Sequence, residues 1–182
     1  MKILIASDIH GSARFCSTLA DRIDEEAPDR ILLLGDLLYH GPRNALPDGY
    51  DPKTVARILN DLKDRIVAVR GNCEAEVDQM VLEFPCMADY TELVDDRGRM
   101  LFATHGHLWN PENLPYLAFG SAFLYGHTHK KQLERENAAG ILLVNPGSVS
   151  IPKDGSRSFA LFEDGVFSLK ALSGEPIAEA AL

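Results

Sequence analysis

The chain of 182 residues is 46% hydrophobic and 25% charged, the composition of one soluble globular domain, so we expect a single domain spanning residues 1–182. Its 18 Lys and Arg against 27 Asp and Glu give a net charge of −9, which argues against a broad basic face for nucleic acid or acidic lipid. No apolar run reaches the ~18 residues of a membrane span, no signal peptide opens the sequence, and the three unpatterned cysteines suit reduced thiols. These features predict a cytoplasmic protein with no membrane partner.

The first part of the chain predicts strands that alternate with helices. Three short, mostly apolar runs are typical of buried strands, at residues 2–6, 31–34 and 66–69. Between the first two runs, Phe15, Leu19 and Ile23 recur at helical spacing. Asp51 followed by Pro52 then reads as the start of a second helix. This β-α-β-α-β order predicts parallel strands covered by helices.

The second part of the chain predicts hairpins. The segments 90–94 and 100–103 flank a turn-forming Asp-Asp-Arg-Gly, and the short strands expected at 158–162 and 166–169 flank Glu-Asp-Gly. Further short strands are expected at 123–125 and 141–144. Together the two parts predict an α/β fold, an α-β-β-α sandwich in which two mixed sheets pack together and helices flank them.

Polar side chains of the kinds that bind metals follow five of the predicted strands, at the point where each strand ends. They are Asp8 and His10, Asp36, Asn72, His105, and His127 with His129. The carboxyl ends of strands in open α/β sheets form ligand sites, and carboxylates, imidazoles and an amide make a mixed N/O ligand set. These seven side chains are too many for one tetrahedral ion, so they fit two ions that share one carboxylate.

Each of these residues has an ordinary alternative role when taken alone. A loop histidine is usually a solvated surface residue, and Asp or Asn after a strand usually forms a turn. The chain has six histidines, however, and four of them belong to this series while a fifth, His107, sits two residues after His105. Solvated histidines and turn-forming Asp or Asn would have to occur by coincidence at every one of these positions, so a metal site is the favoured interpretation.

These motifs, in this order, resemble the calcineurin-like metallophosphoesterase superfamily over roughly residues 1–150. The matching blocks are Asp8-x-His10, Gly35-Asp36, Gly71-Asn72, His105 and Gly126-His127-x-His129. Segments 40–44, 70–73 and 145–148 are similar to those of small bacterial phosphodiesterases within that superfamily. The resemblance implies a metallophosphoesterase-like fold and an enzyme, a metal-dependent phosphoric diester hydrolase.

The resemblance also implies a dinuclear site. Asp8, His10 and His129 would hold the first ion, Asp36 would bridge, and Asn72, His105 and His127 would hold the second. Manganese is the usual ion in the family, with iron, zinc and nickel as alternatives, and a bridging hydroxide would attack phosphorus without a covalent intermediate. Two ions bring more positive charge than Asp8, Asp36 and a hydroxide cancel, so the site would be locally cationic within an acidic protein.

Four further residues are expected to take part in catalysis or substrate binding. Much of the superfamily carries a histidine after the asparagine, assigned as the acid for the leaving group, whereas this chain has Cys73. Its thiol is either a proton donor or an inert side chain; weak protonation would favour aryl esters, whose leaving group is already acidic. Arg43, with Asn44, and Arg70 are candidates to contact phosphate oxygens, although each arginine could equally be a solvated or paired surface residue. His40 and His107 are weaker candidates.

The expected substrate is therefore a small phosphodiester. A phosphomonoesterase or protein phosphatase would use the same metals and stays open, as does a non-catalytic protein-binding scaffold, although that would be expected to lack ligands. A nuclease would need a basic channel that is not visible here. The resemblance is also compatible with a homo-oligomer.

Overall fold

The computed structural model describes residues 1–136 and 140–182, and it contains two mixed β-sheets. The first sheet has the strand order β11-β10-β9-β1-β2-β3. Its strands are β1 (Ile3–Ala6), β2 (Arg30–Leu33), β3 (Ile66–Ala68), β9 (Ser158–Glu163), β10 (Val166–Ala171) and β11 (Pro176–Ala181). Strands β1, β2 and β3 are parallel, as predicted, and β9 runs antiparallel to β1.

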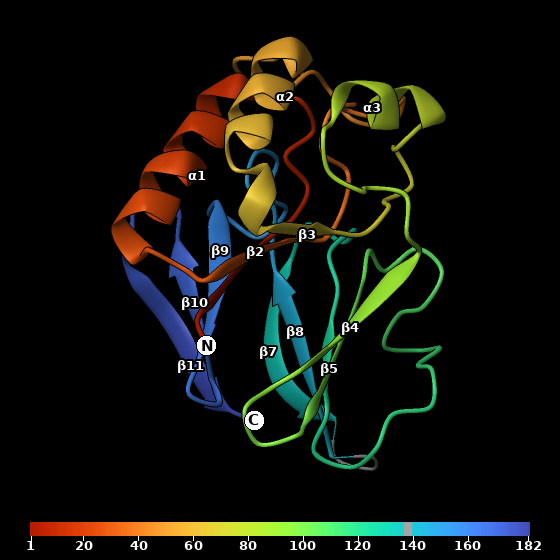
Figure 1. Cartoon of the computed structure of the whole chain (residues 1–182), viewed down its shortest axis with the longest axis vertical. Helices are drawn as coiled ribbons and strands as arrows, with labels where there is room; N and C mark the ends of the chain where they lie inside the picture. Colours follow the sequence, from red (N-terminus) through yellow and green to blue (C-terminus); the bar gives the residue numbers. More distant parts are fainter. Residues whose placement is uncertain (137–139) are drawn as a thin grey trace.

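The second sheet has the strand order β4-β5-β6-β8-β7. Its strands are β4 (Tyr90–Val94), β5 (Met100–Thr104), β6 (Ala122–Leu124), β7 (Lys131–Glu136) and β8 (Ile141–Pro146). Strands β5, β6 and β8 are parallel, and β4 forms the predicted hairpin with β5. The two sheets face each other across a shared core (Figure 1) that includes Ile5, Leu101, Leu124 and Val144.

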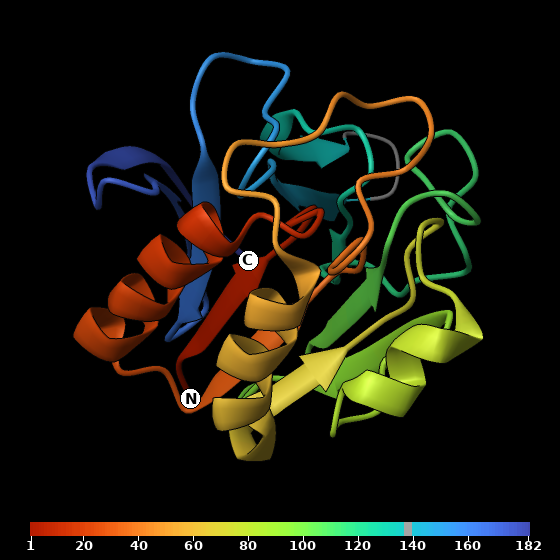
Figure 2. The same cartoon turned by 90° about the horizontal axis from the view of Figure 1, so that it is seen from above.

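Helices cover the outer face of the first sheet. They are α1 (Ala13–Glu26) and α2 (Pro52–Asp61); a short 3-10 turn (Lys63–Arg65) follows α2, and a third helix, α3 (Glu76–Val81), follows β3. The side chains of Ser12 and Asp51 cap α1 and α2, in keeping with the expected start at Asp51-Pro52. Figure 2 shows α1 and α2 next to each other, and Leu19 and Leu59 belong to one apolar cluster with Leu4 of the sheet.

The outer face of the second sheet is covered by an irregular segment, residues 105–120, and no helix of the described chain lies there. Phe102, Phe123 and Leu143 on this face contact Trp109 and Leu114 of the segment. The prediction of two packed mixed sheets is therefore confirmed, while the predicted helical layer is present on one side only. Within the part of the chain that the structure describes, no helix is long and apolar enough to cross a membrane.

Three elements were not predicted: β7, β11 and α3. Strand β7 (Lys-Gln-Leu-Glu-Arg-Glu) is mostly charged and β11 begins with a proline, and both lie at the edge of a sheet, where such residues are tolerated. Helix α3 spans six residues and has one buried side chain, so it lacks an apolar stripe. These elements carry too little burial to leave a periodic pattern in the sequence.

Candidate metal centre

The seven predicted ligands converge at the carboxyl ends of five strands, in the segments that follow β1, β2, β3, β5 and β6. Backbone hydrogen bonds hold these segments together: the N–H groups of Asp8 and His10 donate to Gly35 and Asp36, and the N–H of Gly126 donates to His105. The structure thus brings together side chains that are up to 121 residues apart in the sequence, from Asp8 to His129.

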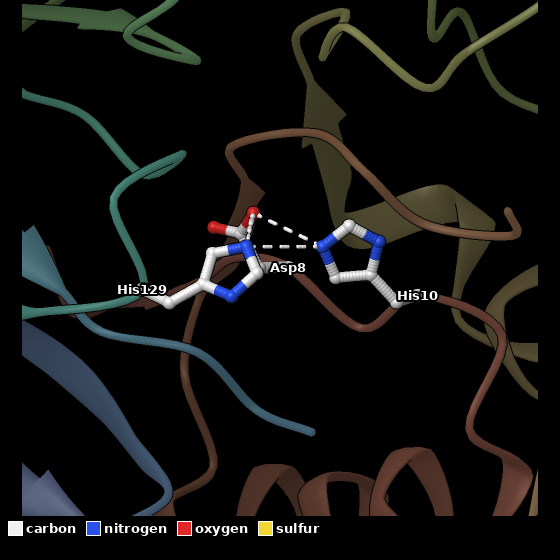
Figure 3. Close-up of side chains that lie close together, drawn as sticks. All are labelled: Asp8, His10 and His129. Atoms are coloured by element: carbon white, nitrogen blue, oxygen red, sulfur yellow. Dashed lines mark hydrogen bonds and ion pairs between the residues drawn. The ribbon is translucent and has the colours of Figure 1, made fainter. Parts of the chain in front are cut away.

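Asp8, His10 and His129 form one cluster (Figure 3), and all three are buried. The Nε2 of His129 lies 3.0 Å from Oδ1 of Asp8, and the Nε2 of His10 lies 3.4 Å from the same oxygen. The two Nε2 atoms are 3.1 Å apart. The three ligand atoms therefore face a common point, as donors to one cation do.

Asp36, Asn72, His105 and His127 form a second cluster beside the first. The Nε2 of His105 lies 3.4 Å from Oδ2 of Asp36, 3.1 Å from Oδ1 of Asn72 and 3.3 Å from Nδ1 of His127. Asn72 is exposed and His127 is half-buried, so this cluster opens towards solvent.

Asp36 joins the two clusters. Its Oδ2 lies 3.4 Å from Nε2 of His105 and 3.6 Å from Nε2 of His10. One carboxylate oxygen thus faces imidazole nitrogens of both sets, the position that a carboxylate shared between two ions requires. The other oxygen of Asp36 accepts a hydrogen bond from the backbone N–H of Cys73 at 2.8 Å.

Backbone carbonyls fix the orientation of three of the imidazoles. The Nδ1 of His10 lies 2.8 Å from the carbonyl of Tyr39, that of His105 2.7 Å from Leu34, and that of His129 2.9 Å from Ile151. A carbonyl only accepts, so each Nδ1 carries a hydrogen and each Nε2 faces the centre, where it offers a lone pair when the ring is neutral. Metal-binding histidines are held in the same way.

The charges of the clusters favour a cation. Burial alone would raise the pKa of Asp8, but the adjacent imidazoles of His10 and His129 hold that pKa well below its usual range. Burial alone would lower the pKa of His105, but Asp36 and Asp8 raise it to about 9. Among the described residues, Oδ1 of Asp8 is a buried oxygen with no hydrogen-bond donor. Two buried carboxylates, inward lone pairs and this unpaired oxygen fit divalent metal ions.

The backbone is strained at the ligands. Asp8, His10, Asp36, His127 and His129 have positive φ angles of 49–63°, and they make up five of the seven non-glycine residues with positive φ in the described chain. This conformation costs ~1–3 kcal/mol per residue and persists only where its surroundings enforce it. The positive φ angles are thus concentrated at five of the seven predicted ligands, as is typical of a functional site.

A glycine allows the close approach of two of these segments. At Gly126 a Cβ would overlap Oγ of Ser7 and lie 2.7 Å from Oδ2 of Asp8. Asp8 Oδ2 accepts hydrogen bonds from Oγ of Ser7 at 2.6 Å and from the N–H of His127 at 3.0 Å. Only glycine at position 126 leaves room for this arrangement.

Glu74 supports the second cluster and was not predicted. Its half-buried carboxylate accepts hydrogen bonds from the N–H groups of Asp36 (2.8 Å), Leu37 (2.6 Å) and Gly71. Burial and the nearby charge of Asp36 raise the pKa of Glu74 to about 7. The signal available in the sequence was an acidic residue two positions after Asn72.

Side chains of residues 145–150 donate hydrogen bonds to the backbone that carries the first cluster. Oγ of Ser148 donates to the carbonyl of Asp8 at 2.8 Å, and Oγ of Ser150 donates to the same carbonyl at 3.1 Å. Asn145 Nδ2 donates to the carbonyl of Gly126 at 2.8 Å. The signal available in the sequence was a group of polar residues at the end of the apolar strand β8 and directly after it.

An open pocket of about 380 Å³ lies over the clusters. It is lined by the ligands Asp36, Asn72, His127 and His129 and by Arg43, Asn44, Thr128 and Lys153. Arg43 and Asn44 therefore lie beside the predicted ligands, and Lys153 is a cation of the same pocket that sequence reasoning missed. Arg70 does not line this pocket, because its guanidinium is paired with Asp89 at 2.6 Å.

Cys73, His107 and His40 lie at different places around the centre. The Sγ of Cys73 is within 4.8 Å of ligand atoms of His10 and Asp36. Burial and the charge of Asp36 raise the pKa of its thiol, which keeps the sulfur protonated in this arrangement. The ring of His107 lies beside His105, with centroids 5.4 Å apart, whereas His40 packs edge-on between Tyr39 and Tyr50.

Comparison with known proteins identifies the family. Residues 1–164 match the calcineurin-like phosphoesterase superfamily domain. The chain is 45% identical over 178 residues to phosphodiesterase YfcE of Escherichia coli strain K12, which covers 97% of this chain and 95% of that protein. The solved structure of YfcE, a phosphoesterase from E. coli, matches with a TM-score of 0.95 at 44% identity over 100% of this chain and 99% of that one. A structure described as a novel archaeal phosphodiesterase shares the fold, with a TM-score of 0.63 at 20% identity over 100% of both chains. The predicted family, two-sheet fold and phosphoric ester hydrolase class are confirmed: the chain belongs to the calcineurin-like phosphoesterase superfamily.

Proposed function

We propose that this chain hydrolyses small phosphodiesters with two divalent metal ions. The observation that carries the proposal is the position of Asp36, whose Oδ2 faces the imidazoles of His10 and His105 in two separate ligand clusters. The name of the relative that is 45% identical over nearly the whole chain, a phosphodiesterase, supports the choice of substrate. Manganese is the ion we expect first, with iron, zinc and nickel as alternatives for a mixed N/O set.

Seven residues of this chain would hold the ions. Asp8, His10 and His129 would hold one, Asn72, His105 and His127 the other, and Asp36 would bridge. When bound, the two ions supply positive charge for the phosphoryl oxygens and an acidified bridging water, the attacking hydroxide expected from the sequence. The carbonyls of Tyr39, Leu34 and Ile151 keep the imidazole rings in the orientation that binding needs.

Residues around the pocket would bind the substrate. Arg43 and Lys153 bring positive charge to the pocket, and Asn44 adds an amide, while the side chain of Asn44 is itself held by the carbonyl of His40 at 2.8 Å. A guanidinium and an ammonium suit phosphate oxygens. We leave Arg70 out of this set because Asp89 already occupies its guanidinium.

Cys73 stands where many relatives carry the histidine that protonates the leaving group. We propose that leaving-group protonation is weak in this chain, so that esters with an acidic leaving group, such as aryl esters, are preferred. The catalytic role of Cys73 stays a prediction, and replacing it with serine or alanine tests it: a proton donor would be lost in the alanine variant, whereas an inert side chain would leave kcat nearly unchanged.

The direct test is a substrate screen on protein stripped of metal with a chelator and reloaded with Mn²⁺. We expect Mn²⁺-dependent hydrolysis of bis(p-nitrophenyl) phosphate that exceeds hydrolysis of p-nitrophenyl phosphate. Preference for the monoester would make the protein a phosphomonoesterase on the same site. Absence of hydrolysis with every ion of the manganese, iron, zinc and nickel set would contradict enzymatic function.

A further inference from the structure

A second cavity lies directly beside the metal centre and is almost wholly apolar. It has a volume of about 360 Å³ and lies between α2, α3 and the segment that follows β2. Its lining includes Tyr39, Tyr50, Ala56, Cys73, Val77 and Val81. Nothing in the metal chemistry described above uses this cavity.

The cavity and the metal centre share part of their walls. Cys73 lines the cavity, and its Sγ lies within 4.8 Å of ligand atoms of His10 and Asp36. Tyr39 also lines the cavity, and its carbonyl accepts the hydrogen bond that orients His10. A group joined through one ester bond to a phosphate held at these ligands would therefore lie beside the cavity.

Apolar side chains in the cavity wall remain exposed. Val77 is 57% exposed, Val81 48% and Tyr39 42%. Covering apolar surface of this kind stabilises a complex by about 25 cal/mol per Å². Two charged residues line the cavity, Lys53 and Asp78, and the carboxylate of Asp78 is already used by the N–H of Ala75 at 2.9 Å.

One of the two neighbouring cavities carries positive charge and the other is apolar, and a phosphate ester with an apolar organic group would suit both. The pocket over the metal ligands carries Arg43 and Lys153, which suit the phosphate, and the second cavity suits an uncharged, apolar group. A phosphomonoester with a small alcohol would leave the second cavity empty. A diester that carries an aromatic or bulky aliphatic ester group would fill both cavities.

We propose that the apolar cavity bordered by Tyr39, Cys73, Val77 and Val81 binds an aromatic or bulky aliphatic ester group of the substrate. The inference rests on the proposed phosphodiesterase function and names its substrate class: diesters with at least one apolar ester group. Selectivity arises from the fit of that group, independently of the metal that is bound.

The test compares two phosphonates that differ only in their organic group, phenylphosphonate and methylphosphonate, as competitive inhibitors of the Mn²⁺-loaded protein. Their P–C bond is not hydrolysed, so it makes no difference whether the cavity takes the leaving group or the retained group. We expect phenylphosphonate to inhibit about tenfold more strongly, which corresponds to ~1.4 kcal/mol. In the variant Val77→Asn/Val81→Asn this ratio should fall towards one, because polar side chains then line the cavity mouth.

Two further variants make the test specific. Val94→Asn changes a valine of equal exposure (57%) on β4, outside the cavity, and should keep the tenfold ratio. Ala56→Leu fills the cavity from α2 and should lower the ratio by occupying space rather than by adding polarity. Circular dichroism and thermal unfolding check that each variant is folded.

The outcomes separate this inference from the proposed function. An unchanged ratio in folded Val77→Asn/Val81→Asn and Ala56→Leu, with Mn²⁺-dependent diester hydrolysis intact in the native protein, would overturn the inference alone. An equal response to the two phosphonates in the native protein would do the same. Failure of the native protein to hydrolyse any diester would overturn both.

Discussion

The carboxylate of Glu74 accepts a hydrogen bond from the backbone N–H of Asp36 at 2.8 Å. The same carboxylate accepts from Leu37 at 2.6 Å and from Gly71, so it connects the segment after β2 to the segment after β3. The position of Asp36 between the two ligand clusters therefore depends on a residue that contributes no atom to either of them.

We predict that Glu74→Gln lowers both stability and metal affinity. A glutamine side chain offers one acceptor oxygen in place of two, so at least one of the three backbone N–H groups loses its partner, at a cost of about 1–3 kcal/mol. The free energy of unfolding from urea titration and the Mn²⁺ dissociation constant measure the effect. Glu76→Gln, an exposed residue of α3, is the matched control and should change neither quantity.

Gly126→Ala should disrupt the first ligand cluster. The added Cβ overlaps Oγ of Ser7 and reaches Oδ2 of Asp8, so Asp8 has to move. Backbone constrained on both sides cannot relax freely, and we expect a loss of about 2–4 kcal/mol in unfolding free energy together with weaker Mn²⁺ binding. Gly98→Ala is the control, because a Cβ there meets nothing within 4 Å and adds only the cost of its positive φ. Equal Mn²⁺ affinity in the two variants would contradict the account.

Asp95 should make the stability of the protein depend on pH, far from the metal ligands. Burial alone would raise the pKa of Asp95, but hydrogen bonds from the N–H groups of Arg99 and Arg97 and from the Arg99 guanidinium lower it below its ordinary value. Because the folded-state pKa is lower than the unfolded one, the carboxylate stabilises the fold above the unfolded pKa. This stabilisation disappears as the pH falls through the folded-state pKa.

The test is a comparison of native protein and Asp95→Asn in urea titrations from pH 7 down to pH 3. We expect the variant to be less stable by about 1–3 kcal/mol at pH 7, since Asp95 is buried and its partner Arg99 is half-buried, and the difference to shrink towards pH 3. A difference that stays constant over this range would show that the charge of Asp95 is not responsible.

Arg43→Ala and Lys153→Ala should weaken substrate binding more than the chemical step. Both residues line the pocket over the metal ligands and neither belongs to the ligand clusters. Loss of one cation near a phosphate should raise KM about 3- to 10-fold, with a smaller effect at high salt because ions screen the interaction. Arg57→Ala, on the exposed side of α2, serves as the control. A fall in kcat at unchanged KM would place these residues in the chemical step instead.

The sequence predicted the centre of the fold more fully than its periphery. Strands β1 and β3 are apolar throughout, β2 is apolar after Arg30, and the predicted ligands come just after these strands, so burial and chemistry were both visible along the chain. Edge strands β7 and β11 bury little and are charged or alanine-rich, so their pairing is decided by neighbours that are distant in sequence.

The residues of the site that were not predicted belong to no sequence motif, and only the folded chain brings them next to the predicted ligands. Glu74 and Ser148 bind backbone atoms of the ligands' segments, and Lys153 reaches the pocket from the segment before β9. Arg70 was a candidate for phosphate binding because it lies two residues before Asn72. Its guanidinium forms an ion pair with Asp89, a contact that the sequence does not indicate. The positive φ angles of Asp8, Asp36 and His129 likewise come from the tertiary hydrogen bonds around them.

The central claim is that Asp36 is shared by two divalent ions, and metal stoichiometry measures it most directly. Native protein and Asp36→Asn, with the exposed helical variant Asp21→Asn as control, are stripped of metal, titrated with Mn²⁺ and assayed on bis(p-nitrophenyl) phosphate. The account predicts two Mn²⁺ per chain in the native protein and in Asp21→Asn, and fewer than two in Asp36→Asn with at least a hundredfold loss of activity. Two bound Mn²⁺ and full activity in Asp36→Asn, or a single bound ion in the fully active native protein, would contradict it.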